Sequence, residues 1–484
     1  MKILLCYPPV SEEYNKIRDS GLTPHLSTLC IACHLLSVYD DIDIKIEDGH
    51  HKNYDEMCRI IKSYCPDIIG YSVDFTNYSN AVKLSDYAKS LSPDIWNVMG
   101  SNHATNMCDV ILRSRKSVDF ISLCDGEPSW EDLVLVRKGK IQREKARNLA
   151  FFDSQLGEIV HTPKDIMDLN KMVPVNYDLI DLKPYFDLQK KVMGDDFRML
   201  QFTSQRGCIN KPLCVFCGRY TDGIRFRDPE VYAAEIARYA EQYQLTEVWD
   251  RSDSFIQSIR WLESFCNALE HHTNRFKNGI TTFKTYSRAD QLLREDVMQY
   301  LKRLNFRMVF IGYEAGDDRI LKNIGKHANL DVYRRATENT FRAGLDIDAS
   351  FIVGLPGENR ESMQNHISFV RELVAMGLDK IRVNRLLVLP GTPLYSTVMK
   401  KYPELADMDI IPQDELQEKL FSTNLYDLSD FGGSVEAFKE AQRECAEAMT
   451  SAVLEKGGGI EGYGYGKDKN ILSGKQMQSK MEKI

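Results

Sequence analysis

The feature that most constrains the fold is an alternation of short apolar, β-rich segments with amphipathic stretches, which occurs in two series along the chain. In the first series, over residues 1–137, the expected strands are 3–6, 42–47, 68–73, 95–99 and 120–123, with a helical pattern at 81–91. Connections between parallel strands are right-handed, and both faces of such a sheet must be covered. The first series therefore predicts an open, doubly wound α/β sheet.

The second series begins near residue 198 and ends near residue 400. Its expected strands are 200–204, 247–250, 282–287, 308–313, 349–353 and 381–388, and its expected helices include 229–243, 295–304 and 361–376. Six βα units predict a partial barrel. Residues 138–197 have weaker periodicity and several prolines, which predicts a linker, and 401–484 predicts a helical region that ends in a Gly-rich tail.

Composition excludes several classes of protein. The chain has 484 residues, of which 43% are hydrophobic and 27% charged, as in globular proteins of about three folded units. Its net charge of -8 has the wrong sign for a protein that depends on phosphate neutralisation, so no nucleic-acid partner is expected. We find no apolar run long enough for a membrane helix and no signal peptide, and we expect a cytoplasmic protein with reduced thiols.

The segments that follow the expected strands of the first series are rich in Gly, Ser, Thr and Asn. They are Ser72 to Tyr78, Gly100-Ser-Asn-His-Ala-Thr105 and Asp125-Gly-Glu127. Ligands of doubly wound sheets bind at the carboxyl ends of the strands, so these loops would suit a nucleotide-like or phosphate-bearing ligand. Ordinary turn chemistry is the alternative explanation.

The strongest chemical signal is a C-x5-C-x2-C motif formed by Cys208, Cys214 and Cys217, directly after the first strand of the second series. Three thiolates on one loop can hold three irons of a cubane cluster and leave the fourth iron open to a chelating ligand. A zinc knuckle is the alternative, but it needs a fourth protein ligand, and no His or Cys follows soon after Cys217. The other nine of the twelve cysteines are scattered and predict packed, reduced thiols.

With these motifs, the chain resembles the cobalamin-dependent radical S-adenosylmethionine (SAM) enzymes over roughly residues 1–400. The resemblance rests on the cysteine loop with Phe216, on residues 250–255, 288–290, 311–316, 351–357 and 390–395, and on residues 99–105 and 125–127 in the first series. It implies an N-terminal Rossmann-like cobalamin domain over 1–137 and a radical SAM barrel over 198–400.

The resemblance also implies the cofactors and the residues that contact them. Cys208, Cys214 and Cys217 would hold a 4Fe-4S cluster. Contacts to SAM would come from Phe216, Gly218, Asp253, Arg288 and Glu314. Contacts to cobalamin, in its methylcobalamin form during turnover, would come from Ser72, Thr76, Asn77, Tyr78, Gly100, Ser101, His103, Ala104, Thr105, Gly126 and Glu127.

Two departures from the family pattern bear on these roles. The first cysteine gap has five residues, including Pro212, where three are common, and we expect the insertion to bulge outward. Ser101-Asn102 stands where Gly-Pro is usual. The near motif Asp48-Gly-His50 resembles a cobalt-ligating histidine motif of other cobalamin enzymes but follows the second strand, so we interpret it as a loop. Thr76, Asn77 and Tyr78 would then face the lower side of cobalt.

The implied activity is methylation of an unactivated carbon through a 5'-deoxyadenosyl radical and methylcobalamin, with an electron donor such as flavodoxin or ferredoxin. A non-methylating oxidation, cyclisation or ring rearrangement by the same cofactors is one alternative, and a non-catalytic metal or cobalamin carrier is another. The long cysteine loop and the lysine-bearing tail favour a peptide or protein substrate over a small molecule.

Overall fold

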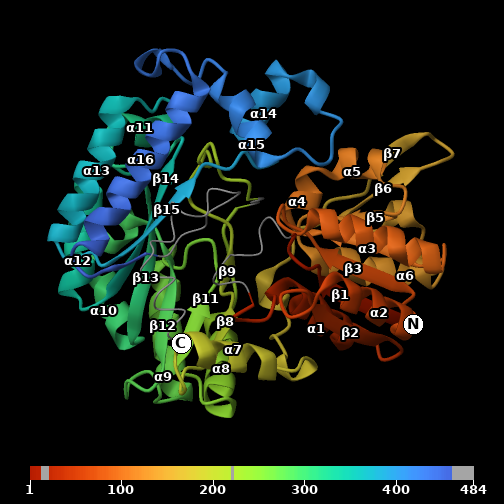
Figure 1. Ribbon diagram of the computed structural model, residues 1–484. Coiled ribbons are helices and arrows are strands. Elements are labelled where there is room, and N and C mark those ends of the chain that lie inside the picture. The colour runs from red at the N-terminus through yellow and green to blue at the C-terminus, as the bar shows by residue number, and fades with distance from the viewer. Residues whose placement is uncertain (12–20, 220–222, 461–484) are drawn as a thin grey trace.

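The computed structural model describes residues 1–11, 21–219 and 223–460, which form two sheets joined by a crossing segment (Figure 1). The first sheet has the order β2-β1-β3-β4-β5-β6-β7. Its parallel strands are β1 (Lys2–Tyr7), β2 (Asp43–Asp48), β3 (Ile68–Ser72), β4 (Trp96–Gly100) and β5 (Phe120–Ser122). The doubly wound α/β prediction is confirmed, with each expected strand within one or two residues of the observed one.

Two helical layers cover this sheet. Buried residues of α2 (Tyr54–Tyr64), α3 (Tyr78–Leu91) and α5 (Cys108–Ser114) pack on one face. On the other face, α1 (Leu26–Val38) and α6 (Gly126–Arg137) pack on Ile3, Leu5 and Val98. The short α4 (Ser101–Asn106) follows β4 directly.

The segment expected as a linker contributes to the first sheet. β6 (Leu149–Asp153) pairs antiparallel with β5, and β7 (Glu158–His161) pairs antiparallel with β6. β6 is nearly all buried, whereas the ends of β7 are exposed. These strands have only five and four residues and lack a long alternating pattern, which explains why periodicity alone did not reveal them. The remainder of the segment crosses to the second sheet through α7 (Lys183–Met193).

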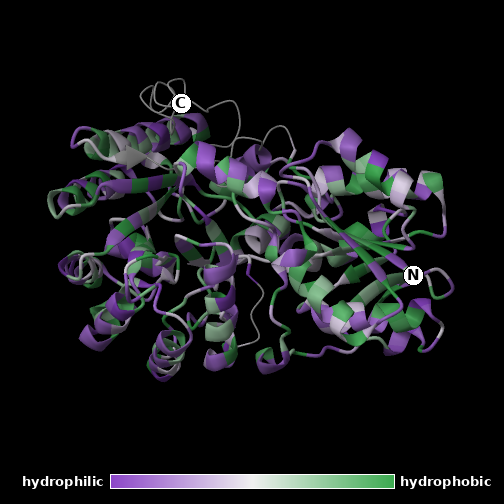
Figure 2. Cartoon of the chain, turned by 90° about the horizontal axis from the view of Figure 1, so that it is seen from below, coloured by the Kyte–Doolittle hydropathy of each residue, from purple (hydrophilic) through white to green (hydrophobic). Residues whose placement is uncertain are grey.

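The second sheet is entirely parallel and forms the partial barrel predicted from the sequence. Its strands are β8 (Met199–Phe202), β11 (Glu247–Asp250), β12 (Thr282–Ser287), β13 (Phe306–Glu314), β14 (Asp346–Val353) and β15 (Lys380–Arg385), with β16 (Gly459–Ile460) added beside β15. Their connecting helices are α8 (Pro229–Gln242), α9 (Ile259–His272), α10 (Glu295–Arg303), α11 (Asp318–Asn323), α12 (Leu330–Arg342) and α13 (Arg360–Ala375). Apolar residues concentrate on the strands and inner helix faces (Figure 2).

One expected strand, 381–388, is longer than the observed β15. Beyond Arg385, the backbone of Val388 exchanges hydrogen bonds with the Gln413 side chain instead of a neighbouring strand. The chain then continues through α14 (Pro393–Lys401), α15 (Gln413–Phe421) and α16 (Val435–Leu454), which packs on α13 and β15. The predicted helical C-terminal region is confirmed. Most of the predicted Gly-rich tail, from 461 onward, lies outside the described residues.

Across residues 1–11, 21–219 and 223–460, no helix is both long and apolar enough to cross a membrane.

Candidate functional site

The two sheets present the carboxyl ends of their strands to one cavity of about 360 Å³. Its first wall contains Ser72, Gly100 and Ser122, at the ends of β3, β4 and β5. Its second wall contains Gly207, Arg219 and Asp253, which follow β8 and β11 in the barrel. A volume of this size is typical of small-molecule and cofactor sites. The cavity lies where open α/β sheets bind their ligands.

The predicted cysteine loop lies beside this cavity, between the short paired strands β9 (Gln205–Arg206) and β10 (Arg225–Phe226). Gly207 starts the loop with φ +99, and a Cβ there would approach the Gly223 carbonyl oxygen to 2.0 Å, so only glycine fits. The Gly207 N–H donates to Asp253 at 2.8 Å, and the Cys217 N–H donates to the Cys214 carbonyl at 2.9 Å. The loop conformation is therefore set by its own backbone bonds and by Asp253.

The three thiols of the loop do not form a preassembled site for a single metal ion. All three cysteines are half-buried. Within the part of the chain that the structure describes, their sulfur atoms do not form a group in which all lie within 4.8 Å of one another. A single zinc ion with sulfur ligands at about 2.3 Å holds those sulfurs about 3.8 Å apart. Burial raises the pKa of the Cys214 thiol to about 11, so a metal must displace its proton.

The predicted SAM contacts lie around this loop, and each charged one already has a partner. Arg288, after β12, binds Asp290 through two hydrogen bonds of 2.9 and 3.1 Å. Glu314, at the end of β13 with φ +62, pairs with Lys326 at 2.9 Å. Sequence reasoning missed Lys326, because it lies outside any strand end and only the fold brings it to Glu314.

The remaining predicted SAM residues are also placed at the loop. Phe216 is half-buried and packs against the barrel core. The Gly218 carbonyl accepts a hydrogen bond of 3.2 Å from Asn106 of the first sheet, and a Cβ at Gly218 would lie 3.4 Å from the Pro390 carbonyl oxygen. Asp253 forms an ion pair with Arg219. These contacts fix the loop between the two sheets.

The predicted cobalamin residues divide into three groups. Those that line the 360 Å³ cavity are Ser72, Gly100, Ser101, Gly126 and Glu127. Tyr78 and His103 line a smaller cavity of about 160 Å³ against residues 390–416. Thr76, Asn77, Ala104 and Thr105 line neither cavity.

The residues expected below cobalt are engaged elsewhere. The Thr76 hydroxyl donates to Asp74 at 2.5 Å, and the fully buried Asn77 side chain donates to the Ser72 carbonyl at 3.1 Å. The Tyr78 hydroxyl donates to Asp409 at 2.6 Å, and Arg115 also binds Asp409. These bonds hold the loop after β3 and join it to the C-terminal region. His50 lies beside Asp48 and stacks on Tyr7, in agreement with its interpretation as a loop residue.

His103 is the unusual member of this group. Both of its ring nitrogens are buried, and neither has a hydrogen-bond partner among the described residues. The ring lies 4.7 Å from that of Tyr78, measured between centroids. Burial lowers the pKa of His103 to about 4, so the ring is neutral near pH 7. Unpaired buried nitrogens are costly, and they mark His103 as a candidate ligand contact.

An ion-pair network joins the cobalamin-type loop to the cysteine loop. Arg206, two residues before Cys208, donates to Asp125 at 2.7 Å and to Glu127 at 2.6 Å. Arg225 of β10 also binds Asp125. Burial alone would raise the pKa of Glu127, but the charge and hydrogen bonds of Arg206 lower it below its usual value. Glu127 thus lines the cavity with its carboxylate already paired to Arg206. The sequence analysis did not identify Arg206, because its partners are distant in sequence.

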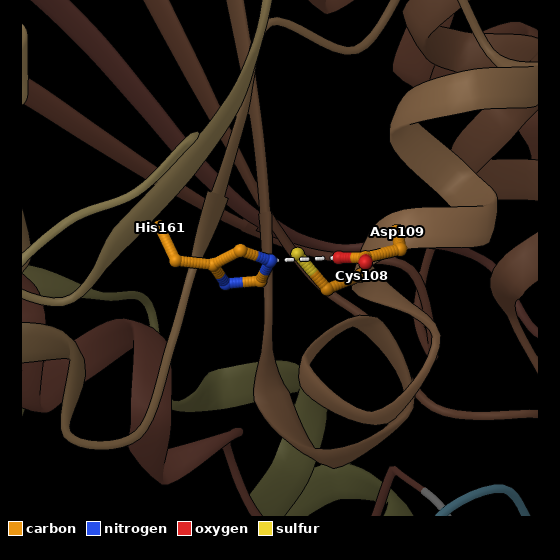
Figure 3. Close-up of side chains that lie close together, drawn as sticks. All are labelled: Cys108, Asp109 and His161. Carbon is orange, nitrogen blue, oxygen red and sulfur yellow. Dashed lines mark hydrogen bonds and ion pairs between the residues drawn. The ribbon is translucent and has the colours of Figure 1, made fainter. Parts of the chain in front are cut away.

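A second cluster of metal-type ligands lies at the surface of the first sheet (Figure 3). Cys108 and Asp109 begin α5, and His161 ends β7. His161 and Asp109 form a hydrogen-bonded pair of 2.8 Å, with side chains 49% and 54% exposed. An ordinary surface pair explains this contact, and such pairs contribute about 1 kcal/mol or less.

Comparison with known proteins agrees with this geometry. The Radical SAM superfamily model matches residues 202–370. The chain is 26% identical over 403 residues to an uncharacterised methyltransferase of Pyrococcus horikoshii, covering 82% of each protein. It is 25% identical over 327 residues to an anaerobic magnesium-protoporphyrin IX monomethyl ester cyclase of Rubrivivax gelatinosus, covering 66% of this chain and 56% of the cyclase.

A solved structure shares the two-sheet fold. The radical SAM methyltransferase TsrM of Kitasatospora setae, with cobalamin and a 4Fe-4S cluster bound, aligns with a TM-score of 0.66 at 14% identity. The alignment covers 83% of this chain and 78% of TsrM. The matched residues 202–370 include the cysteine loop and strands β11 to β14 of the partial barrel, so this part of the chain is similar to the radical SAM superfamily.

Proposed function

We propose that the chain is a cobalamin-dependent radical SAM methyltransferase that methylates an unactivated carbon. The observation that carries the proposal is the single cavity that joins the cysteine loop to the glycine-rich ends of β3, β4 and β5. Two cofactors that act on one substrate must lie close together, and this cavity is lined by the loops of the first sheet and by Gly207 and Arg219, which flank the three cysteines.

The cavity suits a ligand with apolar and polar parts. Its inner end is lined by Leu5, Val98 and Trp130, which would accept an aromatic base such as that of the cobalamin nucleotide. Its rim carries Ser72, Ser101 and backbone groups near Gly100 and Gly126. Gly100 keeps this space open, because a larger side chain would grow toward Ser122, whose Cβ lies 3.5 Å from a Cβ built at Gly100.

When bound, the cluster and SAM supply a 5'-deoxyadenosyl radical, and methylcobalamin supplies the methyl group. Cys208, Cys214 and Cys217 would hold three irons through their sulfurs. Arg288 and Glu314 would orient the charged amino-acid end of SAM, sharing their present partners Asp290 and Lys326. The apolar inner wall would exclude water from reactive species.

The relatives support methylation but also keep one alternative open. The Pyrococcus relative, a methyltransferase by name, matches over 82% of its length. The Rubrivivax cyclase favours a ring-forming reaction as the second candidate, although the chain spans only 56% of that protein. We propose a peptide or protein as the substrate, with a small molecule as the alternative. We also propose an electron donor of the flavodoxin or ferredoxin type.

The test does not require the substrate. The full chain is loaded anaerobically with iron, sulfide and hydroxocobalamin, reduced chemically, and incubated with SAM labelled with deuterium on its methyl group. We expect labelled methylcobalamin, S-adenosylhomocysteine and 5'-deoxyadenosine, each detected by mass spectrometry. Cys217→Ala should abolish the formation of 5'-deoxyadenosine. Cys65→Ser, at an exposed cysteine distant in sequence from the cysteine loop, should not affect it.

Each other outcome contradicts a defined part of the proposal. Formation of 5'-deoxyadenosine without label on cobalamin would favour the non-methylating reaction. Cobalamin or metal binding without either product would favour a carrier. Tightly bound zinc without iron would overturn the cluster.

A further inference from the structure

The five-residue gap in the cysteine loop does not bulge outward as a whole. Ile209 is 49% exposed and Lys211 is exposed, but Asn210 between them is only 4% exposed. A polar side chain that is turned inward while its neighbours face solvent needs a reason, since burying an amide costs free energy unless it is hydrogen-bonded.

Asn210 donates toward two of the three predicted cluster ligands. Its backbone N–H donates to the Cys208 sulfur at 3.5 Å, and its side-chain nitrogen donates to the Cys214 sulfur at 3.3 Å. The same nitrogen lies 3.1 Å from the carbonyl oxygens of Pro212 and Gly325. Two N–H hydrogens are shared among three acceptors, and a metal-bound thiolate would be the most strongly charged of them.

The orientation of the Asn210 amide is fixed from its other end. Arg288 donates to the Asn210 side-chain oxygen at 2.7 Å. A guanidinium has no acceptor, so the amide cannot be flipped, and its NH2 group must face Cys214. Asp290 in turn holds Arg288 through two hydrogen bonds. A continuous chain of contacts thus runs from Asp290 to the cysteine sulfurs.

We propose that Asn210 is a positioning residue that raises the reduction potential of the cluster by donating hydrogen bonds to its cysteine ligands. The inference rests on the proposed 4Fe-4S cluster. Reduction adds one negative charge to the cluster, and N–H donors at its sulfurs stabilise the reduced state more than the oxidised state. A cluster that is easier to reduce can accept an electron from a weaker donor. Because Arg288 is also the predicted SAM contact, Asn210 couples the cluster loop to that residue.

The experiment measures the midpoint potential of the cluster in the full chain by anaerobic redox titration, with the electron paramagnetic resonance (EPR) signal of the reduced cluster as readout. Asn210→Leu removes the side-chain donor, and Asn210→Asp replaces it with a negatively charged oxygen of the same shape. We expect the potential to shift to more negative values in the order wild type, Asn210→Leu, Asn210→Asp. Lys211→Ala, at the exposed neighbour, is the matched control and should stay closer to wild type than either variant.

Three results would contradict the proposed role of Asn210 or the cluster on which it depends. A loaded Asn210→Leu or Asn210→Asp protein with the wild-type potential would overturn the role of Asn210. Failure of both variants to bind iron, with Lys211→Ala fully loaded, would also overturn it, because Asn210 would then be required for assembly alone. A wild-type chain that binds no iron would instead refute the cluster.

Discussion

The cysteine loop and the loops at the carboxyl edge of the first sheet meet at one cavity but are built differently. In the cysteine loop, side chains such as Asn210 and Asp253 turn toward the predicted ligand sulfurs or the loop backbone. In the loops of the first sheet, other protein groups already bind Thr76, Asn77 and Glu127. The cavity there is bounded by small residues such as Gly100. Under the proposed function, one site would recognise its cofactor by donor atoms and the other mainly by shape.

We expect the largest effect from the loss of one of the three cysteines in the cysteine loop. Cys214→Ala removes one of three thiolates, and we expect loss of all cluster iron and of 5'-deoxyadenosine formation. Cobalamin affinity should stay within about twofold, since Cys214 does not line the main cavity. Iron analysis and cobalamin absorbance titration measure the two effects. Parallel loss of cobalamin would show that the sites are not separable.

The second substitution places a larger side chain in the main cavity, on the wall formed by the first sheet. Gly100→Val adds a branched side chain near Ser122, with backbone φ of -145 that valine tolerates. We expect cobalamin affinity to fall on the order of 100-fold, as for a steric clash of about 3 kcal/mol. Iron content should be unchanged. Unaltered cobalamin binding would contradict recognition by shape.

The ion pair between the two loops should contribute to stability. Arg206→Leu leaves Glu127, whose side chain is 3% exposed, buried without its partner. Breaking such a pair costs about 3 kcal/mol. We expect a lower thermal midpoint for the apo chain, whereas Arg113→Leu, at an exposed residue in the last turn of α5, should change it little. Equal midpoints would show that the network is not needed to join the sheets.

His103 should make stability depend on pH. Its folded pKa of about 4 lies below the usual 6.5, so the unfolded chain binds the proton more readily. Its contribution is complete above pH 6.5 and is lost as the pH falls toward 4, by on the order of 3 kcal/mol. His25 has a similarly lowered pKa, so the measurement is the difference between wild type and His103→Gln in the pH dependence of the thermal midpoint. Parallel curves would contradict the burial of a neutral ring.

The smallest expected effect concerns Ser101, which stands where the family has glycine and adopts φ +76. The left-handed conformation costs a non-glycine residue about 1–2 kcal/mol, and glycine adds about 0.5–1 kcal/mol of unfolded-state entropy. Ser101→Gly should therefore stabilise the chain by about 0.5 kcal/mol. A destabilised Ser101→Gly protein, measured by its thermal midpoint, would show that the serine side chain is needed at this turn.

The sequence predicted the parallel strands well, because segments such as 3–6 and 308–311 form continuous apolar runs, which are typical of a sheet covered on both faces. It did not predict β6 and β7, whose pairing depends on the edge of an existing sheet. The three cysteines could be proposed as cluster ligands from the sequence because all three lie in one loop. Arg206, Lys326 and the inward turn of Asn210 were not, since their partners are brought close only by the fold.

Under the proposed function, the cluster and cobalamin lie close together on either side of the main cavity. The most direct measurement is the EPR spectrum of the full chain loaded with both cob(II)alamin and a reduced cluster. We expect the cob(II)alamin lines to broaden when the cluster is reduced, because two unpaired spins that lie close together interact. Lines that stay narrow, with both cofactors present in full amount, would contradict it.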